Sequence, residues 1–255
     1  MRNIAENFKN TNGNGSSHPI DCSLRLDLER DYHPYSDVLK QEGRVRIPQF
    51  LDMGAEYLYN FARSNDEWIQ VINTEDGVLE IELDQWQAYN DANKSAIKTD
   101  MYQRASKGFQ YSYAAVAVPV AEEIGCEGDP LSNFLQFTAE TGFQTILEQL
   151  TGVADLKFTD GQLTVYHPGD FLTRHDDSVA GKNRIAAFVL GLTPIWRMEW
   201  GGLLHFHPMD NEPALALVPD FNTLDLFTVP RLHSVSEISA AALFPRYALT
   251  GWLSK

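Results

Sequence analysis

The sequence contains little cysteine and no long apolar segment. Its 255 residues include two cysteines, Cys22 and Cys126, which allow one disulfide at most and suit a reducing compartment. The longest apolar runs, such as 114–121 and 185–192, are far shorter than the ~20 residues that a membrane-spanning helix needs. The first residues also lack the apolar core of a secretory signal. We therefore predict a cytoplasmic protein that does not enter a membrane.

Basic residues are scarce as well. The chain has 20 Lys and Arg against 35 Asp and Glu, which gives a formal net charge of −15 and a pI near 4.8. A protein that binds nucleic acid needs a basic face to neutralise phosphates, so we expect no nucleic-acid partner. The acidity either keeps the protein soluble or attracts a basic partner. It makes no prediction about oligomeric state.

The composition and residue pattern divide the chain into a tail, a helix-rich part and a strand-rich part. Residues 1–20 are rich in Asn, Gly and Ser and predict a disordered tail. We predict one domain over 21–255, with helical support and a few strands in 21–150 and the core in 151–255. The first part should contain helices from Asp52 to Arg63 and over 84–106, one or two helices over 131–150, and strands over 68–73 and 78–83.

Short β-rich runs separated by Gly, Pro, Asn and Asp fill the part after Thr151. Runs at this spacing are typical of an antiparallel sandwich or barrel, so the predicted fold class is α+β, mainly β. The predicted strands cover 162–167, 185–192, 203–206, 214–218, 223–229, 234–238 and 246–253.

One motif in this part has the composition of a metal site. His175-Asp176-Asp177 lies between two predicted strands, and on an extended segment residues i and i+2 point the same way. His233, immediately before a later strand, offers a third ligand. Two imidazoles and one carboxylate form the facial triad of non-haem iron(II) oxygenases, which leaves coordination positions open for a 2-oxo acid and O₂. Alone, an H-x-D match is more often a solvated turn.

Arg246 on the last predicted strand strengthens the metal hypothesis. A cosubstrate with a distal carboxylate needs a fixed cation, and arginine binds carboxylates through two nitrogens. Strand alternation places Thr250 on the same face, where its hydroxyl can reach that carboxylate, and Tyr166 on the preceding strand offers a phenol. A simple zinc hydrolase, the rival metal assignment, has no use for Arg246.

The remaining histidines compete for the metal. His205 and His207 share a strand face but have no carboxylate in a comparable position, and His167 next to Pro168 is more typical of a strand end.

With these residues in place, the segment 162–252 resembles the prolyl-hydroxylase branch of the 2-oxoglutarate- and iron(II)-dependent oxygenases. It is most similar to the catalytic domain of the eukaryotic enzymes that hydroxylate a proline of a small-subunit ribosomal protein. The resemblance rests on short motifs in the family's order: Gly169-Asp170-Phe171-Leu172, His175-Asp176-Asp177, Arg184-Ile185, Gly201-Gly202-Leu203-Leu204, Leu217-Val218-Pro219-Asp220-Phe221-Asn222, Phe227-Thr228-Val229, His233-Ser234-Val235-Ser236-Glu237-Ile238, Arg246 and Gly251-Trp252.

The resemblance implies a double-stranded β-helix (jelly-roll) core with an N-terminal helical layer packed on one sheet. It implies iron(II) at His175, Asp177 and His233, with 2-oxoglutarate bound by Arg246 and Tyr166, O₂ as oxidant and ascorbate as a candidate reductant. It also makes Arg184 a candidate substrate contact, although a solvated charge at a strand end is an equal alternative. Gly201 and Gly202 are expected to form a structural turn.

The chain departs from the family pattern at two positions. Gly191 stands where relatives often carry a tyrosine that binds the cosubstrate carboxylate, and Ala248 stands where many have serine. These changes leave open how the carboxylate of 2-oxoglutarate is bound. The ribosomal enzymes also carry a second, non-catalytic domain, which is not expected here because the chain ends at Lys255.

The leading functional hypothesis is a dioxygenase that hydroxylates a prolyl residue of a protein or peptide, with an acidic surface that suits a basic polypeptide. A small-molecule hydroxylase acting on a free amino acid or metabolite with the same iron centre is the alternative. A non-catalytic binding or sensing homologue is disfavoured, because the three metal ligands and Arg246 are all intact.

Overall fold

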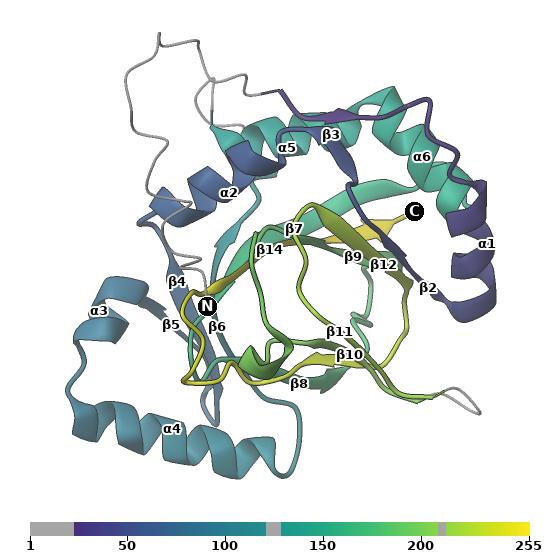
Figure 1. The fold of residues 1–255 in the computed structure, drawn as a ribbon. Coiled ribbons are helices and arrows are strands. Elements are labelled where there is room, and N and C mark those ends of the chain that lie inside the picture. Colours follow the sequence, from purple (N-terminus) through teal and green to yellow (C-terminus); the bar gives the residue numbers. More distant parts are fainter. Residues whose placement is uncertain (1–22, 121–128, 209–212) are drawn as a thin grey trace, which may run out of the picture.

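A computed structural model describes residues 23–120, 129–208 and 213–255 (Figure 1). The tail predicted at 1–20 lies outside these residues. Within them, no helix is both long enough and apolar enough to cross a membrane.

Most strands belong to one curled antiparallel sheet. Its order is β11 (Leu215–Leu217), β10 (Leu204–Phe206), β13 (His233–Val235), β8 (Phe171–His175), β6 (Tyr111–Ala117), β7 (Lys157–Tyr166), β14 (Arg246–Ser254), β9 (Arg184–Gly191), β12 (Thr223–Thr228) and β2 (Arg44–Ile47). The hairpin β4 (Ile69–Thr74) and β5 (Gly77–Glu82) joins through β6, and β1 (Arg25–Leu26) pairs separately with β3 (Leu51–Met53). The sheet curls so that β8, β10 and β11 lie opposite β7, β14, β9 and β12 (Figure 1).

Four helices cover the outer face of β7, β14, β9 and β12 (Figure 1). They are α1 (His33–Glu42), α2 (Ala55–Ser64), α5 (Pro130–Ala139) and α6 (Thr141–Thr151). Their apolar sides form one buried core with the sheet, in which Leu58, Phe134 and Leu147 lie with Phe188 and Leu249. This layer confirms the predicted jelly roll with N-terminal helices on one sheet, and its packing fixes the back wall of the cavity described below.

Two further helices, α3 (Leu83–Ala88) and α4 (Asp91–Ala105), lie on the side of β4 and β5 instead (Figure 1). They share a smaller core of Ile72, Ile81, Trp86, Met101 and Phe171. The single helix expected over 84–106 is wrong, because the Asn90 side chain accepts a bond from the Asn93 amide and caps a new helix there.

The start of α2 also differs from the prediction. Asp52 belongs to β3, and the helix begins after Gly54, whose φ of 104° is in the left-handed region. A Cβ at Gly54 would lie 2.8 Å from the Ser23 carbonyl oxygen, so only glycine fits this close approach.

The first 150 residues contribute strands to the sheet as well as helices. Strands β2, β4, β5 and β6 come from the first 150 residues and complete the sheet, and β6 lies between β8 and β7 in its middle. The first part of the chain therefore contributes a wall of the core and not only its support.

Candidate metal centre

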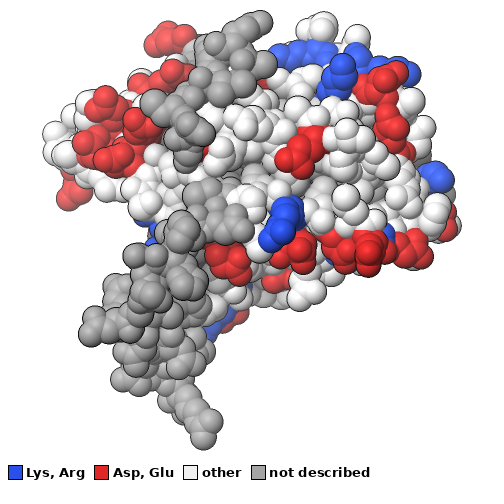
Figure 2. Space-filling view, turned by 90° about the horizontal axis from the view of Figure 1, so that it is seen from above, with Lys and Arg blue, Asp and Glu red and all other residues white. Residues whose placement is uncertain are grey.

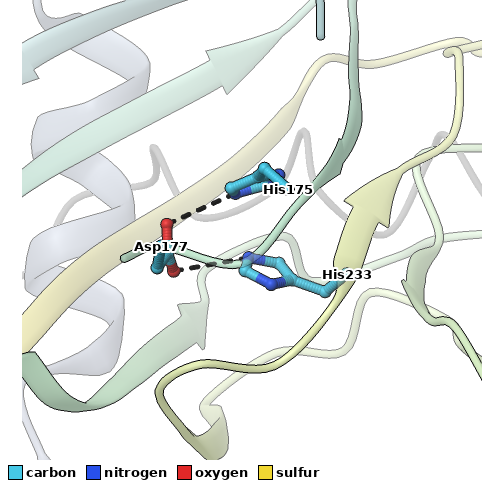
Figure 3. A group of neighbouring side chains, drawn as sticks. All are labelled: His175, Asp177 and His233. Atoms are coloured by element: carbon cyan, nitrogen blue, oxygen red, sulfur yellow. Dashed lines mark ion pairs between the residues drawn. The ribbon is translucent and has the colours of Figure 1, made fainter. Parts of the chain in front are cut away.

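The two candidate histidine ligands lie on neighbouring strands. His175 is the last residue of β8, His233 is the first of β13, and the two face each other directly in the ladder. Their ring centroids are 4.0 Å apart. Asp177 follows β8 in the loop toward β9, and its carboxylate points at both rings (Figure 3).

The three side chains converge within bonding reach of one ion. Asp177 Oδ1 lies 3.3 Å from His175 Nε2, and its Oδ2 lies 3.4 Å from His233 Nε2. One ligand atom from each residue can be chosen so that all three lie within 4.8 Å of one another. In the described part of the chain this is the one cluster of three or more such ligands.

Each histidine is held in the tautomer that a metal needs. His175 Nδ1 lies 3.0 Å from the Thr173 carbonyl oxygen, and His233 Nδ1 lies 2.8 Å from that of Arg231. A carbonyl only accepts, so Nδ1 carries the proton and the Nε2 lone pair faces Asp177.

The electrostatics favour the deprotonated form of two of the three ligands. Burial and the nearby His175 lower the pKa of His233 to about 4. Burial opposes ionisation of Asp177, yet contacts with His175, His233 and the Trp252 indole bring its pKa below the usual range. A neutral imidazole at His233 and a carboxylate at Asp177 can bind a divalent cation without first releasing protons.

His175 and Asp177 lie close together, but the prediction that a shared strand face brings them together is wrong. Strand β8 ends at His175, and Asp177 has a φ of 63°, so the segment is not extended and strand alternation does not apply. A turn, not a shared strand face, brings the carboxylate to the imidazole.

A cavity of about 300 Å³ opens beside the triad, and its wall includes Arg246, Tyr166 and Thr250. The Arg246 side chain is buried, with 4% of the residue exposed, and among the described residues it donates no hydrogen bond and forms no ion pair. The carboxylate of Asp225 is already engaged by Arg46, at 2.7 and 2.8 Å. A buried cation without its own carboxylate fits a ligand that brings one.

Tyr166 pairs across the strands with Arg246, whose guanidinium lies 5.2 Å from the centre of the Tyr166 ring. Thr250 lies further along β14 on the same face of the strand and lines the same cavity. Its hydroxyl donates to the Gln162 carbonyl. The structure therefore brings all three expected cosubstrate residues to one wall, next to the triad.

Sequence reasoning missed the contribution of β6 to this cavity. Phe109, Tyr111 and Tyr113 line it in a row, and Tyr113 stacks on Tyr166 with ring centroids 5.2 Å apart. The signal is present in the sequence, because these aromatics alternate with the buried polar residues Gln110 and Ser112.

The two departures from the family pattern have a structural context. A Cβ at Gly191 would lie 2.1 Å from the Asp220 carbonyl oxygen, so no side chain fits there. Ala248 is fully buried, and its carbonyl accepts from the Thr164 hydroxyl. The expected structural role of Gly201 also fits, since a Cβ there would lie 2.0 Å from the Glu237 carbonyl oxygen.

Arg184, His167, His205 and His207 do not line the cavity. The Arg184 side chain is 8% exposed and bonds to Asp160 and to the Asp177 carbonyl. His205 pairs with Ser234 in the ladder, and His207 Nε2 bonds to the Ser234 hydroxyl at 2.9 Å. His167 has its Nδ1 3.9 Å from Asp170.

The model of the 2OG-Fe(II) oxygenase superfamily matches residues 161–254, which run from β7 to the end of β14 and include the whole triad. These residues form a 2OG-Fe(II) oxygenase domain. The family uses iron(II), 2-oxoglutarate and O₂. The chain is also 31% identical over 118 residues to the mouse prolyl 3-hydroxylase OGFOD1. That match covers 43% of this chain but 21% of the relative, so the chain spans about a fifth of that protein's length.

Solved structures of oxygenases share the fold of the 2OG-Fe(II) oxygenase domain and its helices. An oxidoreductase of the 2OG-Fe(II) oxygenase family from Burkholderia pseudomallei aligns with a TM-score of 0.62 at 14% identity, over 91% of this chain and 94% of that one. A Pseudomonas putida prolyl-4-hydroxylase gives 0.56 at 16% identity, over 88% and 99%. A Trichoplax adhaerens prolyl hydroxylase, solved with a hypoxia inducible factor peptide, gives 0.53 at 18%, over 86% and 87%.

Proposed function

We propose that this protein is an iron(II)- and 2-oxoglutarate-dependent dioxygenase that hydroxylates a prolyl residue of a protein or peptide. The observation that carries the proposal is the pairing of two sites in one cavity. Three candidate ligands converge from His175, Asp177 and His233, and the buried guanidinium of Arg246 faces the same space without a carboxylate partner.

Different residues would bind the metal, bind the cosubstrate and exclude water. His175, Asp177 and His233 would hold the iron. Arg246 would bind the distal carboxylate of 2-oxoglutarate, with the Tyr166 hydroxyl as a donor beside it. Thr250 lies on the same wall, and its hydroxyl would have to turn away from the Gln162 carbonyl to donate to the cosubstrate. The iron, 2-oxoglutarate and O₂ together supply the oxidation of the substrate C–H bond. The apolar wall of Leu204, Phe227 and Val235 limits the access of water to the reacting atoms.

A polypeptide substrate is favoured by the mouth of the cavity and by the surface. Phe109 lines the cavity with 49% of its surface exposed, so the wall continues to the outside of the molecule. The formal net charge of −15 suits a basic partner. Acidic side chains gather along the edges of the face that carries α2, α5 and α6 (Figure 2), which is the outer side of the sheet and not the side of the cavity. The similarity to prolyl hydroxylases supports a proline as target. Ascorbate as reductant and a cytoplasmic location complete the proposal.

The test is turnover by the full chain with iron(II), 2-oxoglutarate, ascorbate and a set of basic proline-containing peptides. We expect succinate to form together with a peptide that gains one oxygen atom on proline, read by mass spectrometry. His175→Ala should abolish both, whereas His205→Ala, a histidine outside the ligand cluster, should abolish neither.

Other outcomes lead to different functions. Hydroxylation of free amino acids with no peptide product would favour the small-molecule hydroxylase. Metal binding without any succinate, with or without candidate substrates, would favour a non-catalytic sensing protein and would overturn the proposal.

A further inference from the structure

The inward direction of the Asp177 carboxylate depends on an unusual backbone conformation. Its φ of 63° is in the left-handed region, which residues other than glycine adopt seldom and keep only when their surroundings hold them. Asp177 lies in the loop between β8 and β9, outside any strand ladder. Something other than regular hydrogen bonding must therefore fix its position.

The side chain of Arg184, the first residue of β9, holds Asp177 in this position. Its Nη1 donates to the Asp177 carbonyl oxygen at 3.2 Å, and its Nη2 donates to Asp160 Oδ2 at 2.6 Å. Its guanidinium carbon also lies 4.0 Å from the centre of the Trp252 ring. One side chain thus joins the ligand loop to the rigid sheet.

The partners of Arg184 come from the strands beside it. Strand β14 runs between β7 and β9, and Trp252 on β14 pairs directly with Asp160 on β7. An arginine can occupy this place because its planar guanidinium stacks on the indole while separate N–H groups reach two acceptors. A lysine ammonium offers a point charge and no flat face.

We propose that Arg184 is a positioning residue, which with Asp160 and Trp252 locks the Asp177 backbone so that its carboxylate is preorganised for the metal. This inference rests on the proposed metal centre. It assigns Arg184 a role inside the protein, in place of the direct substrate contact that the family resemblance implies. Trp252 both stacks on Arg184 and lines the cavity, as Asp177 does.

The chain offers a matched control in Lys182. Its ammonium binds the same Asp160 oxygen at 3.0 Å, but its side chain is 49% exposed, and in the described part of the chain it donates no bond to Asp177. Arg184→Ala and Lys182→Ala each remove one cation from Asp160, yet only the first frees the Asp177 carbonyl.

The decisive measurement is metal affinity of the full chain, taken by calorimetry with Mn(II) and without cosubstrate or substrate. Loss of a group that orients a ligand typically weakens metal binding by about 10–100-fold, and we expect this for Arg184→Ala. Arg184→Lys should recover part of the loss, and Lys182→Ala should stay within about twofold of wild type. Hydrogen exchange of residues 176–183 in the metal-free protein should become faster in Arg184→Ala alone.

Unchanged metal affinity and unchanged hydrogen exchange in Arg184→Ala would overturn the inference. If that variant then showed a raised KM for the peptide, Arg184 would be a substrate contact instead. If Arg184→Ala does not fold, Arg184→Lys and Asp160→Asn decide, since both should show weaker Mn(II) binding with an intact circular dichroism spectrum. A folded wild type that binds no Mn(II) would instead refute the metal centre itself, and the exchange measurement would still report on the loop.

Discussion

Replacing Arg246 by methionine should separate stability from function. The guanidinium is buried, and among the described residues it has neither an ion pair nor a hydrogen bond. Burial accordingly lowers its pKa, because desolvation disfavours the charged form. Exchanging a buried ionic group for an apolar one of similar size is often neutral or stabilising by about 1–4 kcal/mol. The unfolding free energy of the cosubstrate-free Arg246→Met protein should therefore equal or exceed that of wild type.

Binding of 2-oxoglutarate should change in the opposite direction. Removing one partner of a buried, hydrogen-bonded charge pair costs about 2–5 kcal/mol, and each 1.4 kcal/mol is a factor of about ten. We expect the affinity of the Mn(II)-loaded protein for 2-oxoglutarate to fall roughly 30-fold to several thousand-fold. A concentration 100 times Kd stabilises wild type by about 2.7 kcal/mol, and at that concentration the thermal shift of the variant should nearly vanish.

Arg46→Met is the control for this experiment. Arg46 is bonded at both nitrogens to the buried Asp225, so its loss leaves that carboxylate uncompensated. The control should lose several kcal/mol of stability and keep its affinity for 2-oxoglutarate. If Arg246→Met instead loses as much stability as Arg46→Met and still binds 2-oxoglutarate, Arg246 is a structural cation and the reasoning fails.

Three further predictions test other parts of the molecule. Phe109→Ala should raise the peptide KM while succinate formation without peptide stays the same; equal loss of both would make Phe109 a structural residue. Burial raises the pKa of Asp170 to about 6, above the unfolded value of 3.8, so its contribution to stability is full below pH 4 and is lost as pH rises through 6. The stability gap between wild type and Asp170→Asn should thus shrink by roughly 2 kcal/mol from pH 4 to 7 in denaturant titrations, and a constant gap would mean that Asp170 stays ionised. Gly191→Ala should lower the melting temperature, since its Cβ would meet the Asp220 carbonyl, whereas Gly108→Ala meets nothing within 4 Å and should not.

The strands and the ligand set could be read from the sequence because both depend on local patterns. Apolar residues bounded by turn residues predict the strands over 68–73 and 78–83, which the structure places at β4 and β5. Side-chain chemistry and order along the chain brought His175, Asp177 and His233 together as candidates. The order was sufficient because β8 and β13 are neighbours in the sheet.

What the sequence did not reveal depends on contacts between distant segments. The 111–117 strand was not predicted, and its place between β8 and β7 follows from long-range pairing that no local pattern encodes. The left-handed turn at Asp177 was missed because an aspartate tolerates several backbone conformations, and its neighbours decide between them. The interactions of Arg184 with Asp160 and Trp252 depend on three strands meeting, so the sequence showed only a charge at a strand start.

The loss of a tyrosine at position 191 does not leave the cavity without phenols. The backbone of Asp220 passes so close to Gly191 that this point of β9 admits no side chain. Across the cavity, β6 supplies Tyr113, which stacks on Tyr166 and receives a hydrogen bond from Gln162 Nε2 at 3.1 Å. Both residues line the same cavity as Arg246, so its wall presents two phenols together with that buried cation. A carboxylate bound by Arg246 would therefore be satisfied from β6 and β7, and the close packing at Gly191 is compatible with a cosubstrate in the cavity.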